Sequence, residues 1–284
     1  MSSPQDDGSK NSMGISTYLT VSLLVGVLLY LINKKFGKTI KNWFVITEKW
    51  QLSTICNFSL YNYRLFASFW NRAMKEYHAT MRDMKKSHFD SMLEHKSTDA
   101  DLRKRSVLRV LEIGAGPGAN FEFFPKNSKL MVVEPNAFFE PMFYENQHKY
   151  PDIKMEKFIV SSAEDMKEVG DNSIDIVVST LVLCSVTSVE RTLSEVQRVL
   201  APGGKFYYWE HVHDKPGTWL HLVQNLLSPL WNFLFDGCNL NRNIDQTVLG
   251  CKGFSQVEQK RFNVPLKNGL WGFIRAHVMG QATK

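Results

Sequence analysis

The sequence has few cysteines, and none of them are spaced as a metal-binding or disulfide motif. In 284 residues the four cysteines stand at positions 56, 184, 238 and 251, and no CxxC occurs. This spacing argues against a disulfide framework and against a zinc site built from CxxC pairs. Because disulfides persist mainly in oxidising compartments, a reduced chain that faces the cytosol is the simpler interpretation.

The composition also lacks extremes. Charged residues make up 22% and apolar residues 44% of the chain. These values are close to the globular average, so neither an intrinsically disordered chain nor a fully membrane-embedded one is predicted. The length allows one domain of ordinary size with an appendage, or at most two small domains.

The C-terminal part of the chain lacks the basic excess that a nucleic-acid enzyme would need. The net charge is +6, but it is unevenly placed. Lys and Arg number one against two acidic residues in 1–33, fifteen against seven in 34–105, and eighteen against nineteen in 106–284. The excess lies beside a hydrophobic segment, and no nucleic-acid partner is predicted.

That hydrophobic segment, residues 14–33, has the sequence GISTYLTVSLLVGVLLYLIN and contains no charge. As a helix its twenty residues could cross about 30 Å of hydrocarbon, so a membrane anchor is predicted, preceded by an N-terminal tail, 1–13. The tail is acidic, which disfavours a cleaved signal peptide. Lysines at 34, 35, 38 and 41 place the following domain in the cytosol by the positive-inside rule. A spanning helix and one lying in a single leaflet both remain open.

The region 34–106 is rich in basic and aromatic residues. It suits the headgroup layer of a membrane, and equally a helix that packs on the catalytic domain. Within it, residues 71–95 predict a helix whose apolar stripe is interpreted as core or lid packing. The stripe consists of Met74, Tyr77, Met81, Met84, His88, Phe89 and Met92.

The region 107–284 contains the features that indicate an enzyme. VLRVLEI (107–113) is an apolar run, and GAGPGAN follows with glycines at 114, 116 and 118. A strand, a glycine-rich turn and the start of a helix allow a ligand to approach the backbone closely, because glycine has no Cβ. Alone, this pattern also fits a dinucleotide-binding turn.

Two acidic residues and the order of the later elements favour a different cofactor. Glu112, just before the first glycine, would repel a pyrophosphate but attract a cationic aminoacyl group, and Glu134 ends a second strand where it could accept ribose hydroxyls. A strand (173–183), an amphipathic helix (189–200) and a PGG turn into another strand (201–211) then follow. This order is that expected of a class I S-adenosylmethionine-dependent methyltransferase.

Three further motifs narrow the resemblance. LVLCSV (181–186), EHV (210–212) and LFDGCNLNR (234–242), behind an N-terminal hydrophobic segment, resemble the membrane-anchored methyltransferase-like family of alkyl thiol S-methyltransferases with a type 11 methyltransferase domain. The resemblance implies an α/β, Rossmann-like fold. Its sheet would have seven mostly parallel strands with helices on both faces, a final hairpin from 254–264 and 270–280, and an added N-terminal anchor helix.

The resemblance also implies a set of residues that bind S-adenosyl-L-methionine. Glycines 114, 116 and 118 would cradle the methionine part, Glu112 would lie near its ammonium group and Glu134 would hold the ribose. Many family members place Asp where this chain has Ser162, so the backbone at Ala163 and Glu164 is expected to serve the adenine instead. Thr180 borders the same pocket. Glu164 is equally compatible with a solvated strand end.

The acceptor end is less defined by the sequence. A thiol reacts as its thiolate, so a base near the sulfur would help, and His211 is the candidate; a histidine that only fixes the strand end is the alternative. His211 and His213 have HxH spacing, but no third ligand is evident and no metal is predicted. Substrate-side candidates are Cys184, Asp236, Cys238 and Asn239, the last three following an apolar cap at 219–235.

The expected function is therefore methyl transfer from S-adenosylmethionine to small lipophilic thiols. Alternatives are a methyltransferase of a lipid or quinone-like oxygen or nitrogen acceptor, a non-catalytic lipid-droplet or membrane protein that keeps the fold, and, least favoured, an NAD-dependent oxidoreductase. By resemblance the protein is expected at the endoplasmic reticulum membrane and the lipid-droplet surface, with its catalytic domain in the cytosol.

Overall fold

The computed structural model describes residues 52–265 and 269–284, and the chain divides into two units, residues 1–60 and 61–284. The predicted tail, the predicted anchor at 14–33 and the first part of the basic region lie outside the described residues. Among the helices that the structure describes, none combines the length and the hydropathy needed to cross a bilayer. The second unit includes helical residues from 61 onward as well as the predicted methyltransferase domain, 107–284.

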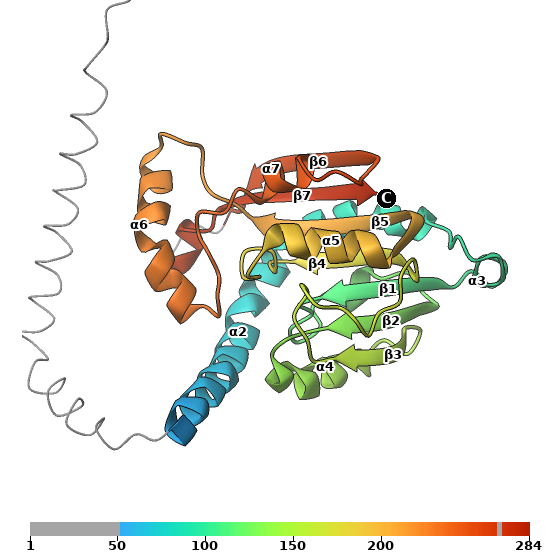
Figure 1. The fold of residues 1–284 in the computed structure, drawn as a ribbon, viewed down its shortest axis with the longest axis horizontal. Helices are drawn as coiled ribbons and strands as arrows, with labels where there is room; N and C mark the ends of the chain where they lie inside the picture. The colour runs from blue at the N-terminus through green and yellow to red at the C-terminus, as the bar shows by residue number, and fades with distance from the viewer. Residues whose placement is uncertain (1–51, 266–268) are drawn as a thin grey trace, which may run out of the picture. The chain divides into compact units, whose positions relative to one another are not determined.

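The second unit is built on one seven-stranded sheet (Figure 1). Its strand order is β3-β2-β1-β4-β5-β7-β6, and β7 alone runs antiparallel to its neighbours β5 and β6. The predicted mostly parallel sheet with a final antiparallel hairpin is confirmed. The strands are β1 (Leu108–Ile113), β2 (Ser128–Val133), β3 (Lys154–Ile159), β4 (Ile174–Thr180), β5 (Leu200–His211), β6 (Gln256–Asn263) and β7 (Ala276–Thr283).

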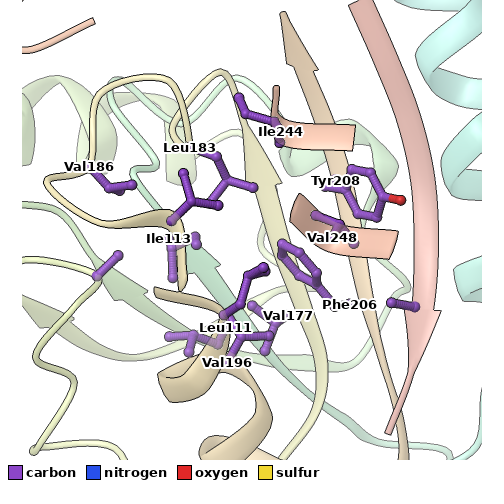
Figure 2. Packing of buried hydrophobic residues seen from close by; sticks show 14 of the residues in the cluster. Leu111, Ile113, Val177, Leu183, Val186, Val196, Phe206, Tyr208, Ile244 and Val248 are labelled. Carbon is purple, nitrogen blue, oxygen red and sulfur yellow. The ribbon is translucent and has the colours of Figure 1, made fainter. Parts of the chain in front are cut away.

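Helices cover both faces of the sheet, which explains why the central strands are apolar along their whole length. The helices are α2 (Leu52–Phe89), α3 (Ala100–Lys104), α4 (Glu140–Gln147), α5 (Val189–Val199), α6 (Trp219–Leu234) and α7 (Ile244–Leu249). Leu111 of β1 packs in a cluster with residues of α5 and α7, some of which Figure 2 shows. Its neighbour Val110 packs on the opposite face with Phe89 of α2 and Phe143 of α4.

The predicted helix at 71–95 is part of the longer α2, which ends at Phe89 and is followed by a 3-10 turn over Asp90–Glu94. One residue was wrongly assigned to the predicted apolar stripe. Met84 is 38% exposed, whereas the next residue, Lys85, is completely buried. Met81 and Phe89 are both buried, and position 85 lies about one helical turn from each, so it belongs to the buried face. A charged side chain therefore occupies the buried face of the helix.

Two predicted strand boundaries also differ. The strand predicted to reach residue 183 ends at Thr180, because Leu181 adopts a left-handed φ of 58° and turns the chain across the carboxyl end of β4. The last strand starts at Ala276 instead of residue 270, and a 3-10 turn occupies Gly269–Gly272. Both shifts place loop residues, and not strand residues, at the end of the sheet where the parallel strands terminate.

Candidate functional site

A cavity of about 1020 Å³ opens at the carboxyl ends of the parallel strands. Its walls come from the segments that follow β1, β2, β3, β4 and β5. Helices α2 and α6, residue 265 and residues 269–274 contribute further lining residues. In Figure 1 the arrowheads of β1 to β5 point toward the side of the sheet on which α6 lies. Ligands of open α/β sheets bind at this edge, so the cavity is the candidate active site.

The glycine-rich turn after β1 forms one wall of the cavity. Gly114 and Gly116 line it, with φ values of 59° and 51° that favour glycine. A Cβ on Gly114 would lie 2.4 Å from a methyl carbon of Val182, so the turn and the loop after β4 approach as closely as a glycine allows. Gly118 does not line the cavity; it packs against Phe121 and Phe143 and shapes the turn from behind.

Beneath this turn, a chain of buried polar groups links α2 to β1. Lys85 donates to Asn120 at 2.6 Å, and the Asn120 amide donates to Glu112 at 2.5 Å and to the Thr180 hydroxyl at 3.1 Å. Burial raises the pKa of Glu112 to about 7, although the Asn120 hydrogen bond and the Lys85 charge act in the opposite direction. Burial likewise lowers the pKa of Lys85 to about 8. Glu112 Oε2 is buried with no hydrogen-bond partner in the described chain, although Glu112 does not itself line the cavity.

Glu134 lines the cavity directly after β2. One of its carboxylate oxygens accepts from the Gly116 N–H and the other from the Asn136 N–H, each at 2.9 Å. These bonds fix the carboxylate to the glycine-rich turn and leave a second lone pair on each oxygen. Burial raises the pKa of Glu134 to about 7 despite the lowering effect of the two N–H donors.

The segment after β3 supplies Ser162 and Ala163 to the cavity wall, and Thr180 lines it from the end of β4. Glu164 does not line the cavity. Its carboxylate accepts from the Ser162 hydroxyl and from the N–H groups of Thr187 and Ser188, so it ties this segment to the loop before α5. The Glu164 side chain therefore stabilises these two loops against each other and does not contact the cavity.

At another part of the cavity wall, three predicted acceptor-side residues come together. Cys184 follows β4, His211 ends β5 and Cys238 follows α6, and their ligand atoms lie within 4.8 Å of one another. His211 Nε2 is 3.1 Å from Cys238 Sγ. The pKa of Cys184 is raised by its hydrogen bond with Cys238 and by burial. Burial would lower the pKa of His211, but the adjacent Cys184 and Glu210 charges raise it.

Two side chains hold the loops that carry this cluster. Glu210 is fully buried and accepts from the Ser179 hydroxyl at 2.6 Å and from the N–H groups of Val182 and Leu183 at 3.2 Å. Asn239 donates to the Cys184 carbonyl from its backbone at 2.9 Å and from its side chain at 3.1 Å. Asn239 does not line the cavity, so the structure places it behind the site, where it fixes one cysteine loop against the other.

The remaining sequence candidates take separate positions. Asp236 lines the cavity, has a left-handed φ of 48°, and has a pKa raised by burial. His213 lies beyond the end of β5 and apart from the cluster. Its Nε2 faces Asn243 Oδ1 at 2.9 Å and its Nδ1 faces the Asp214 carbonyl at 2.5 Å. The HxH spacing therefore does not bring the two histidines to one site.

Aromatic side chains line much of the rest of the cavity. Phe66 and Trp70 of α2 stack at 5.4 Å, and Trp231 of α6 stacks on Phe235 at 4.2 Å. All four line the cavity, together with Trp271. A mostly apolar pocket with a few convergent polar groups is typical of a small-molecule site.

Sequence reasoning missed three residues that organise the site: Lys85, Asn120 and Glu210. Lys85 could have been found from the helical spacing of the α2 stripe, had position 85 been preferred to 84. Asn120 is the last residue of the GAGPGAN motif, and Glu210 is the first of EHV, so both lie in segments that the sequence had already singled out. Their roles are tertiary, because their partners come from other strands and helices.

The residues around the glycine-rich turn fit S-adenosylmethionine. Its α-ammonium group and its sulfonium are cationic, and two buried carboxylates lie at and beneath this turn. One of them, Glu112, retains an oxygen without a partner. At Gly116 an added Cβ would meet only Phe139, at 4.0 Å, so the missing side chain leaves open space beside the Glu134 carboxylate. Glu134 offers free lone pairs that a ribose diol could use.

Comparison with known proteins agrees with this geometry. Residues 111–208 match the family model of a methyltransferase domain. The chain is 42% identical over 177 residues to thiol S-methyltransferase TMT1A of Homo sapiens, covering 62% of this chain and 71% of that protein. It is 38% identical over 204 residues to thiol S-methyltransferase TMT1B of Rattus norvegicus, covering 72% and 80% respectively.

A solved structure shows the same fold. The YcgJ protein of Bacillus subtilis superposes with a TM-score of 0.52 at 14% identity, covering 73% of this chain and 98% of that one. At this identity the likeness concerns the fold alone.

Proposed function

The chain belongs to the thiol S-methyltransferase family of S-adenosylmethionine-dependent methyltransferases, and from this membership we propose that it methylates small lipophilic thiols at a membrane surface. The observation that carries the proposal is the single cavity that contains both the glycine-rich turn with Glu134 and the cluster of Cys184, His211 and Cys238. Aromatic side chains line the same cavity, which suits an apolar acceptor.

S-adenosylmethionine supplies an activated methyl group on a sulfonium, so the chain's own residues need mainly to align the acceptor and exclude water. The glycine-rich turn and Glu134 would hold the cofactor, with the backbone of Ala163 and the Thr180 hydroxyl at the same wall. The aromatic lining from α2 and α6 would bind the hydrocarbon part of the acceptor and keep water out.

An acceptor thiol must lose its proton to react well, because an unperturbed thiol has a pKa of about 8.5. In the described cavity, the cluster of Cys184, His211 and Cys238 contains the groups that could accept this proton. His211 as a general base stays a prediction. It would require the imidazole to take the proton at Nε2, the nitrogen that faces Cys238.

The proposed membrane association is supported by α6, whose exposed face is apolar. Its residues 219–234 include no Asp, Glu, Lys or Arg. Six apolar side chains of one helical face are exposed: Trp219, Leu222, Leu226, Leu230, Phe233 and Leu234. Trp219 is 76% and Phe233 74% exposed, which is unusual for a face of this size in a water-surrounded protein.

The inward face of α6 carries two buried polar side chains beside Trp231. Gln224 is buried and bonds to the Asp214 N–H at 2.7 Å and the Phe273 carbonyl at 2.8 Å. Ser228 is buried and donates to Asn241 at 2.9 Å. Gln224 and Ser228 thus point to the protein together with Trp231, whereas the exposed face is almost entirely apolar, as expected for a helix that lies in the interface of a bilayer. Because Trp231 of this helix lines the cavity, a lipophilic thiol could enter from the membrane.

The location follows from the same proposal. We place the catalytic unit on the cytosolic side of the endoplasmic reticulum membrane and on lipid droplets. The support is the family resemblance, the lysines after residue 33 and the exposed face of α6.

The substrate proposal is tested with a series of straight-chain alkyl thiols. Burial of one methylene contributes about 0.8 kcal/mol, so kcat/KM is expected to rise about fourfold per added CH₂ until the pocket is filled. A flat series, or preferential methylation of alcohols and amines of equal length, would assign the cavity to another acceptor.

The membrane proposal is tested with the full chain on vesicles of phosphatidylcholine brominated on its acyl chains. Emission from Trp219, taken as the difference between the native chain and Trp219→Phe, is expected to be quenched. The control is a tryptophan introduced by Leu93→Trp, at an exposed position in the turn after α2. Equal quenching at both positions, or none at Trp219, would refute the role of α6.

A further inference from the structure

We propose that Cys184, His211 and Cys238 bind a zinc ion whose fourth position takes the acceptor thiol. The proposal rests on the proposed function, because it gives the thiol specificity of the site a physical cause. The sequence predicted no metal, since His211 and His213 lacked a third ligand nearby. The fold supplies the missing ligands from two loops that are distant from His211 in the chain.

The ligand set and its geometry suit zinc. One imidazole nitrogen and two sulfurs lie within 4.8 Å of one another, and the His211 Nε2 to Cys238 Sγ distance is 3.1 Å. Tetrahedral zinc bonds of about 2.0–2.3 Å bring ligand atoms to roughly 3.5–4 Å of one another. Small side-chain rotations would therefore complete the coordination. Two cysteines and one histidine, with one position left open, form a known type of catalytic zinc site.

The loops that carry the ligands are held in place before any ion binds. Glu210 fixes the loop after β4 through the N–H groups of Val182 and Leu183. Asn239 fixes the loop after α6 by two hydrogen bonds to the Cys184 carbonyl. A Cβ on Gly237 would lie 2.9 Å from the Ser185 carbonyl oxygen, so the two loops are in close contact. Such support for the loops is what a metal site requires. The other ring nitrogen, His211 Nδ1, is buried and has no hydrogen-bond partner among the described residues.

The open position would face the acceptor. Cys184, His211 and Cys238 all line the cavity that Gly114, Glu134 and Thr180 also line. A fourth ligand entering from the cavity would therefore lie on the same side as the methyl donor. The surrounding aromatic side chains would leave room for the hydrocarbon part of a thiol and keep competing water at low concentration.

The chemistry of the step balances without an oxidant or reductant. The acceptor R–SH binds as R–S⁻ and its proton leaves to solvent. With zinc bound, His211 Nε2 is a ligand, so the ion takes the place of His211 as the group that favours the thiolate. A sulfur lone pair then forms the S–CH₃ bond while the bond between the methyl carbon and the sulfonium breaks, its electron pair staying on the sulfur of S-adenosylhomocysteine. The thioether product is a weaker ligand than the thiolate and dissociates, which returns the open position.

A disulfide between the two cysteines is the competing use of the cluster. It would leave the buried imidazole without a function, and it would need an oxidising compartment, whereas the predicted setting is the cytosol. Zinc uses all three side chains in their reduced state. The metal also explains why sulfur would be preferred to oxygen, because a soft thiolate is a better zinc ligand than an alcohol.

The test uses the full chain in detergent, stripped with a chelator under reducing conditions and titrated with Co²⁺ as the probe. One equivalent is expected to produce the visible bands of tetrahedral cobalt and a thiolate-to-cobalt charge-transfer band. A short alkyl thiol should then shift these bands. Cys238→Ser should remove most of the charge-transfer intensity, and Cys251→Ser, a free cysteine outside the cluster, should leave the spectrum unchanged.

The outcomes separate this inference from the proposed function. If the native chain binds no Co²⁺ or Zn²⁺ stoichiometrically but still methylates thiols, the metal site is refuted and the function stands. If the ion binds with the expected spectrum and no thiol is methylated, the metal site stands and the function is refuted. The titration of the native chain decides the metal site even if a cysteine variant fails to fold.

Discussion

Replacement of Gly114 by alanine tests whether the backbone cradle is as tight as the structure shows. Gly114 has a φ of 59°, and an added Cβ would lie 2.4 Å and 2.8 Å from the two methyl carbons of Val182. Gly203 provides a matched control, because its φ is 77° and an added Cβ would meet nothing within 4 Å. The two substitutions therefore share the conformational penalty and differ in the steric one.

The expected magnitudes follow from these contacts. A left-handed φ costs an L-residue about 1–2 kcal/mol, which is the whole expected loss for Gly203→Ala. Overpacking adds about 1–3 kcal/mol, so Gly114→Ala should lose roughly 2–5 kcal/mol of unfolding free energy. Val182 belongs to the loop that carries Cys184, so its displacement should also weaken cofactor binding and thiol turnover.

The assay is denaturant unfolding with calorimetric binding of S-adenosylmethionine to each variant. In the double variant Gly114→Ala with Val182→Ala, the steric part should disappear. The double variant should therefore be more stable, by about 1–3 kcal/mol of unfolding free energy, than the sum of the two single losses predicts. A Gly114→Ala chain no less stable than Gly203→Ala, with unchanged cofactor affinity, would refute the close approach of the two loops.

Three further predictions concern polar side chains around the site. Folding raises the pKa of Glu112 from 4.5 to about 7, so its contribution to stability is complete below pH 4.5 and is lost as pH rises to 7. Between these pH values the unfolding free energy of Glu112→Gln should therefore fall by about 3 kcal/mol less than that of the native chain. Denaturant unfolding at several pH values measures this, and parallel stability–pH curves for the two chains would contradict it. Lys85→Met leaves Asn120 Oδ1 without its donor and should cost about 1–3 kcal/mol, together with cofactor affinity in calorimetry; an unchanged affinity would show that α2 does not support the cofactor site. Asn239→Ala should lower thiol turnover while leaving cofactor binding intact, and equal losses in both would mean that Asn239 supports the whole unit and not the cysteine loops.

Much of the fold could be predicted because it depends on local patterns. The apolar runs of β1 and β4 predicted strands that are buried on both faces. The glycines at 114 and 116 predicted the turn after β1. The amphipathic spacing of α5 gave its bounds to within one residue. These features need no knowledge of distant contacts, since each is determined by periodicity and by glycine's backbone freedom.

The site was predictable only in part, because its key contacts are tertiary. Cys184, His211 and Cys238 were separate candidates in the sequence, and only the fold brings them within one cluster. The helical stripe was assigned to Met84, whereas the neighbouring residue Lys85 is the buried one. Asn239 was a substrate candidate because it follows Cys238, whereas in the structure it holds the loop of Cys184.

The central claim is tested most directly by one acceptor that carries both competing groups, a medium-length alkyl thiol with a hydroxyl at its other end. The full chain in detergent is supplied with this compound and with S-adenosylmethionine labelled on the methyl group, and the product is identified by mass spectrometry. A single labelled product, methylated on sulfur, is expected. Folded chain that binds the cofactor and yields only the O-methyl product, or no methylated product, would contradict it.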